Sequence, residues 1–111
     1  MTIEQLREAG ANVDEGFGRC AGNEAFYLKI VKMVLDSDTY DKLNDAIAAH
    51  DLEQGFEYAH ALKGIVANAS LDKLLKPVSE MTELLRARQD VDYSGYLEEM
   101  FRERDLLKAL E

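Results

Sequence analysis

The chain has no tryptophan, one cysteine, one proline and no long apolar run among its 111 residues. A single cysteine, Cys20, excludes an internal disulfide and favours a reducing compartment, so we expect a cytoplasmic protein. No stretch approaches the ~20 apolar residues that a membrane-spanning helix needs, so we expect no membrane partner. The first ten residues contain acidic side chains and no apolar segment, so we expect no signal peptide.

Positive charge is also scarce. The 13 lysines and arginines face 22 acidic residues, which gives a net charge of −9 at pH 7. This balance argues against a phosphate-backbone partner such as DNA or RNA. Hydrophobic residues make up 47% of the chain and charged residues 32%, as in a folded protein. The length fits one domain, so we expect residues 1–111 to form a single helical domain.

The sequence lacks the alternating apolar pattern of β-strands, and its apolar residues recur at helical spacing instead. The short connections between these segments favour antiparallel neighbours. We therefore predict an all-α fold, an up-down four-helix bundle with short additional N-terminal helices. The predicted helices are residues 3–9, 12–18, 24–35, 39–49, a helix that begins after Asp51, 71–88 and 96–110. The predicted N-caps are Thr2, Asn23, Asp38, Asp51, Ser70, and either Asp92 or Ser94.

Two helices carry local features that make specific predictions. Residues 24–35 carry an apolar stripe that comprises Phe26, Ile30 and Met33 together with Tyr27, Val31 and Val34. Pro77 lies inside the helix predicted for residues 71–88. It must either kink that helix or mark a 3₁₀ start that precedes a longer helix.

The stretch YAHALKGIVANAS, residues 58–70, contains unusual choices for a helix. On a helical wheel His60 lies about 115° from the centre of the apolar face, close to Phe56, Lys63, Gly64 and Ala67. A glycine inside a helix costs about 1 kcal/mol relative to alanine. We interpret Gly64 as giving a partner access to the imidazole. Two simpler interpretations stay open: Gly64 packs against another helix, and His60 is a solvated residue at the edge of the apolar face.

The chemistry available to His60 is nucleophilic, because a neutral imidazole is a good nucleophile near neutral pH. Lys63 could neutralise part of the charge of a phosphoryl group on the ring. The sequence has no glycine-rich nucleotide-binding loop, and no second histidine, aspartate or cysteine stands at metal-ligand spacing. We therefore expect neither a metal site nor a cofactor.

His60, Leu62, Lys63, Gly64 and Asn68 resemble the H-x-[LI]-K-G signature of histidine-containing phosphotransfer (HPt) domains, and residues 12–27 and 41–57 are also similar to that family. The resemblance implies a four-helix bundle with an exposed His60. It implies that His60 exchanges a phosphoryl group with a response-regulator receiver domain or a hybrid histidine kinase, in a bacterial-type two-component phosphorelay. Such a protein is a phosphoryl carrier and not an enzyme. Ser70 departs from the family, in which this position is often glycine.

Further site residues follow from the same helix and its neighbour. Phe56 and Ala67 lie close to His60 on the helical wheel, and Asn68 belongs to the matching signature; all three are expected to contact the partner. An antiparallel hairpin that turns at residues 69–70 would bring residues 79–82 opposite His60, and a polar atom there could fix the imidazole tautomer. The candidates are Ser79, Glu80 and Thr82. Two other functions remain: a helical binding module of the same fold without phosphotransfer, and an unrelated enzyme that uses His60 as a base.

Overall fold

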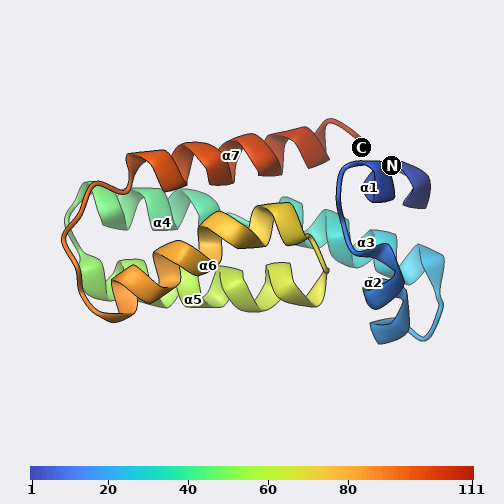
Figure 1. Ribbon diagram of the computed structural model, residues 1–111, viewed down its shortest axis with the longest axis horizontal. Helices are drawn as coiled ribbons and strands as arrows, with labels where there is room; N and C mark the ends of the chain where they lie inside the picture. The colour runs from blue at the N-terminus through green and yellow to red at the C-terminus, as the bar shows by residue number, and fades with distance from the viewer.

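The computed structural model describes all 111 residues and contains seven α-helices and no strand, so the all-α prediction is confirmed (Figure 1). None of these helices is long and apolar enough to cross a membrane. The helices are α1 (Ile3–Glu8), α2 (Val13–Arg19), α3 (Glu24–Leu35), α4 (Thr39–Ala48), α5 (Leu52–Asn68), α6 (Asp72–Arg86) and α7 (Ser94–Lys108).

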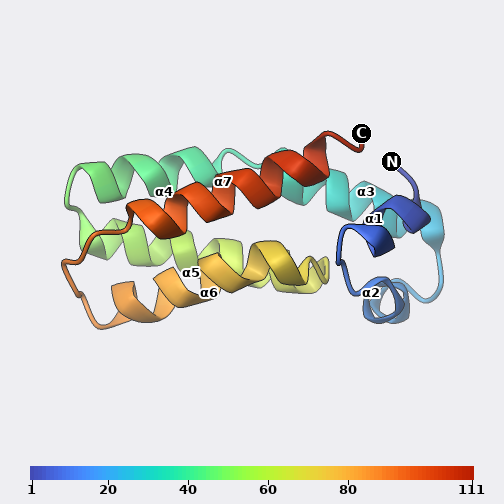
Figure 2. The ribbon, with the colours of Figure 1, turned by 45° about the horizontal axis from the view of Figure 1, so that its top comes forward.

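Helices that follow one another in the sequence pack against one another. Helix α5 lies between α4 and α6, and α6 also packs against α7. Figures 1 and 2 show α3 and α4 one after the other along the long axis of the molecule, with α7 running beside both. The short helices α1 and α2 gather at one end, near both chain termini. This arrangement leaves one side of α5 without a covering helix.

The core is one cluster of 23 buried apolar residues that runs from Ile3 to Leu107. In α3 the buried residues are Tyr27, Val31, Val34 and Leu35. The apolar stripe predicted for this helix is therefore only partly buried, because Phe26 and Met33 are 49% and 64% exposed. Apolar residues occupy both sides of this helix. Tyr27 decides which side is buried, because its ring packs against Gly16 and Phe17 of α2.

Most of the predicted N-caps are confirmed. At these helix starts a polar side chain accepts a hydrogen bond from a backbone N–H of the first turn. Thr2, Asn23 and Asp51 act in this way on the backbone N–H groups of residues 5, 26 and 54. Asp38 does not: the hydroxyl of Ser37 accepts the bond from Thr39 N–H instead, at 3.2 Å. For α7 the carboxylate of Asp92 accepts from the backbone N–H of residue 94.

Several helices end in a residue with left-handed backbone geometry that is not glycine. The φ angles are 52° at Ala21, 56° at His50, 57° at Ser70 and 53° at Arg88. Such a residue lets the next backbone N–H bond back to a carbonyl of the last helical turn. After His50, for example, the N–H of Asp51 donates to the carbonyl of residue 46 at 2.9 Å. The side chain makes this geometry costly, which is why glycine is common at such positions.

The predicted N-cap role of Ser70 is therefore wrong, because Ser70 directly follows Ala69, the C-cap of α5, and the N-cap residue of α6 is Leu71. Residues from the N-terminal third of the chain form hydrogen bonds with Ser70 and its neighbour. The backbone N–H of Asn12 donates to the carbonyl of Ser70 at 2.8 Å, and the Arg19 guanidinium donates to the Ser70 hydroxyl at 2.9 Å. The Tyr27 hydroxyl donates to the carbonyl of residue 69 at 2.8 Å. We call this junction the α5 terminus.

Pro77 lies inside one continuous helix, α6, and is buried. The interpretation that it marks a 3₁₀ start is therefore wrong. Its ring has no N–H, so the carbonyl four residues earlier, on Lys73, has no helical donor. Burial of the proline ring in the core offsets part of this loss.

The left-handed helix ends predict opposite responses to glycine at two positions. His50→Gly should raise the free energy of unfolding by about 1 kcal/mol, because glycine adopts positive φ without a steric cost. The His50 side chain is 78% exposed, so little is lost with it. Ser70→Gly should give a smaller gain or a loss, because it also removes the hydroxyl that accepts from Arg19. Urea denaturation of both variants measures the difference, and an equal gain at both positions would contradict the role given to this hydroxyl.

Candidate functional site

His60 lies in the middle of α5 with its side chain exposed, as the helical wheel predicted. Its neighbours Ala59 and Leu62 are completely buried, so they fix the backbone that carries it. The histidine thus combines an accessible ring with a rigid position. A ring nitrogen that reacts with a partner needs both properties.

Phe56, one turn before His60, forms one wall of the site. Its half-buried ring stacks on the imidazole with centroids 5.5 Å apart and an interplanar angle of 28°. Two guanidinium groups, those of Arg86 and Arg88, each lie 5.0 Å from the centroid of the same ring. Cations at this distance are attracted to the face of an aromatic ring. Phe56 therefore contacts the imidazole and both arginines.

Glu83 of α6 forms ion pairs with two cations of the site, Lys63 and Arg86. Its carboxylate lies 3.4 Å from the Nζ of Lys63 and 3.3 Å from the Nε of Arg86. These hydrogen bonds, with that from Arg86 the stronger, hold the pKa of Glu83 below its usual value. All three side chains are between 38% and 57% exposed, so each ion pair is weak. We call these three residues the Glu83 bridge.

Gly64 faces open space one turn after His60. A Cβ atom placed on it would meet no atom within 4 Å outside its own helix backbone. The alternative interpretation, that Gly64 packs against another helix, is therefore wrong. Access of a partner to His60 remains our prediction for why glycine stands here.

The C-terminal half of α5 borders an apolar surface. A shallow groove of about 460 Å³ lies between α3 and α5. It is lined by Ile30, Met33, Val34, Ser37, Ile65 and Asn68. Of the other predicted contact residues, Ala67 is half-buried next to Asn68, and its carbonyl accepts from Arg19 at 2.6 Å. Met33, an exposed apolar residue of α3, therefore forms part of this groove.

The predicted hydrogen bond from residues 79–82 to the imidazole is absent from the structure. Thr82 is completely buried, and its hydroxyl donates to the carbonyl of Val78 at 2.7 Å. Ser79 is half-buried and Glu80 is exposed, and neither bonds to the ring. The register of α6 explains the difference, because it turns Thr82 into the core and presents the next residue, Glu83, to Lys63.

Sequence reasoning missed Glu83, Arg86 and Arg88. The hairpin geometry that brings residue 80 opposite residue 60 also brings residues near 85 opposite Phe56. Gly55, the neighbour of Phe56, does lie against Leu85. The same register, extended from His60 to Phe56 one turn before it, therefore predicts that this part of α6 lies beside the aromatic ring.

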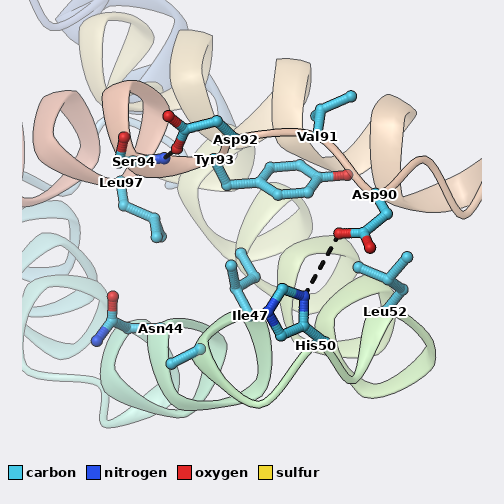
Figure 3. Close-up of a pocket in the computed structure, with 11 residues that line it drawn as sticks. Asn44, Ile47, His50, Leu52, Asp90, Val91, Asp92, Tyr93, Ser94 and Leu97 are labelled. Carbon is cyan, nitrogen blue, oxygen red and sulfur yellow. Dashed lines mark hydrogen bonds and ion pairs between the residues drawn. The ribbon is translucent and has the colours of Figure 1, made fainter.

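A second cavity lies at the opposite end of α5 and does not include His60. It has a volume of about 250 Å³ and lies between the α4–α5 turn and the connection from α6 to α7. Figure 3 shows His50 and Asp90 facing each other across it, with Nδ1 and Oδ1 3.5 Å apart. Nowhere does the structure bring together three or more histidine, cysteine or acidic side chains that could hold a metal ion.

Comparison with known proteins gives one match. The family model of the Hpt domain matches residues 37–111, a range that includes helices α4 to α7 and His60. No curated protein and no solved structure matches the chain.

The open space at Gly64 predicts how the fold responds to substitution there. Gly64→Ala should raise the free energy of unfolding by roughly 0.4–1 kcal/mol, because alanine favours the helix and meets no neighbour. Gly64→Gln should fold normally for the same reason. Gly16→Ala is the matched control and should destabilise the protein, because its Cβ would clash with the Tyr27 ring. Thermal melting tests all three, and a sharp loss of stability in Gly64→Gln would contradict the open site.

Proposed function

Because the chain belongs to the Hpt domain family, we propose that it carries phosphoryl groups in a two-component phosphorelay, with His60 as the acceptor. Hpt domains are phosphocarrier modules rather than catalysts. The observation that carries this proposal is an exposed imidazole on a rigid helix, with Lys63 one turn away and open space at Gly64. Partners with a receiver domain, or a hybrid histidine kinase, would complete the chemistry in their own active sites.

We also propose the finer architecture that this function requires. Helices α5, α6 and α7 would be three rods of an up-down four-helix bundle, and α3 with α4 would be the fourth. Residues 1–111 would form a single domain, since one core cluster extends through the whole chain. The cytoplasm, where phosphorelays operate, is the compartment we propose for it.

The transfer step is a substitution at phosphorus. A lone pair on one imidazole nitrogen of His60 attacks the phosphorus of an aspartyl phosphate. The bond between phosphorus and the carboxylate oxygen breaks, and the carboxylate leaves with the electron pair. The ring then carries a positive charge until the N–H proton on its other nitrogen passes to water. Reversal of these steps delivers the group to the next aspartate.

Cations, an aromatic ring and an apolar groove on this part of the molecule would each assist the transfer. Lys63 and Arg86 would stabilise the charge on the transferring group. Phe56 would hold the ring in one orientation, as the stacking distance of 5.5 Å supports. The groove beside Asn68 would receive apolar side chains of the receiver domain, since most of its lining residues are apolar.

His60→Gln tests the assignment directly. The variant should fold normally, with a change in unfolding free energy within about 0.5 kcal/mol, because His60 is an exposed residue. It should accept no phosphoryl group from a phosphorylated receiver domain or from a kinase. The measurement is acid-labile, alkali-stable phosphate on the protein. Wild-type protein that binds a receiver domain but never gains this phosphate would instead be a binding module without phosphotransfer.

Lys63→Ala should slow transfer about tenfold while leaving the fold intact, since one cation at a developing phosphoryl charge contributes on the order of 1–3 kcal/mol. Lys29→Ala removes an exposed lysine of α3 that makes no ion pair, and it is the matched control. Stopped-flow or quench-flow transfer kinetics with a receiver domain compare the two variants. Equal rates would mean that Lys63 contributes to solubility and not to transfer.

A further inference from the structure

We propose that Glu83 occupies Lys63 and Arg86 in the unphosphorylated protein and releases both cations to the phosphoryl group on His60. Glu83 would thereby set how tightly the protein holds that group. This inference rests on the proposed function. It adds Glu83 as a positioning residue, which acts through Lys63 and Arg86.

The geometry places the Glu83 carboxylate between Lys63 of α5 and Arg86 of α6. One oxygen of Glu83 lies 3.4 Å from the Lys63 ammonium, and the other lies 3.3 Å from the Nε of Arg86. Lys63 is one turn from His60 along α5, where residues three apart are neighbours. Arg86 comes from α6, and its guanidinium lies 5.0 Å from the centroid of the Phe56 ring, which in turn stacks on the imidazole.

The strengths of the competing contacts favour an exchange. The Glu83 bridge is solvent-exposed, so its two ion pairs are weak and can be replaced at little cost. A phosphoryl group carries up to two negative charges and three strong acceptor oxygens. It would therefore compete well for both cations, although Glu83 would remain close enough to repel it.

This balance suits a carrier, which must accept a phosphoryl group and then give it up. Cations without a competing carboxylate would stabilise the phosphorylated state and slow the onward transfer. Glu83 offsets that stabilisation, because its own contacts with Lys63 and Arg86 are restored when the group leaves. The proposed role is thus in the phosphoryl equilibrium and not in the stability of the fold.

The experiment uses the full chain and phosphoramidate, a small donor that needs no partner protein. Its P–N bond breaks, ammonia leaves, and a new bond forms between phosphorus and His60. Glu83→Gln should raise the ratio of phosphorylated to unphosphorylated protein at a fixed donor concentration by about two- to fivefold, and slow hydrolysis by a similar factor. Glu98→Gln makes the same charge change on an exposed α7 residue without an ion pair, and should leave both quantities unchanged.

Carbon-13 NMR of the Glu83 carboxyl group gives a second measurement on the wild-type protein. Phosphorylation should raise the pKa of Glu83, because its two cations then face the phosphoryl group. If Glu83→Gln behaves like Glu98→Gln, or if the carboxyl titration does not move, the proposal is overturned while His60 remains the acceptor. If wild type gains no more phosphohistidine than His60→Gln, the proposed function fails as well.

Discussion

The junction at the α5 terminus is the contact on which the rest of the molecule depends. A helix ends with carbonyl groups that have no donor within the helix, and these need partners when they are covered. Here the donors to these carbonyl groups come from the N-terminal third of the chain: Arg19 at the end of α2 and Tyr27 in α3. The tyrosine hydroxyl is buried with its bond, and burial raises the pKa of Tyr27 to about 12. The same contacts therefore hold the short helices in place and satisfy the end of the long one.

Fixing both ends of α5 has a direct effect on the site. Asp51 caps the start of the helix, the junction closes its end, and residues such as Leu62 anchor its buried face. His60 lies near the middle of this restrained segment, so its backbone has little freedom. The ring then needs only one further restraint, and Phe56 provides it by stacking. A surface residue thus reaches a defined orientation without a hydrogen bond to its ring.

The sequence could predict those features that depend on local spacing, and it failed where distant segments choose between similar faces. The helices, most caps and the exposed His60 follow from residues within a few turns of each other. The buried side of α3 does not, because Phe26 and Val31 are equally suitable for a core and the packing of α2 decides. The role of Ser70 was missed because its left-handed geometry and its partner Arg19 depend on a contact 51 residues away. Glu83 could be placed in the site only by knowing the register between α5 and α6.

The neighbour-to-neighbour packing of α4, α5, α6 and α7 has a consequence for how the chain folds. Contacts between segments that are adjacent in the sequence close short loops, which costs little entropy and allows fast folding. We expect these four helices to assemble first, and the N-terminal helices to dock afterwards on the end of an already formed α5. Because His60, Lys63 and Arg86 all belong to the early unit, the candidate site would form before the chain has finished folding.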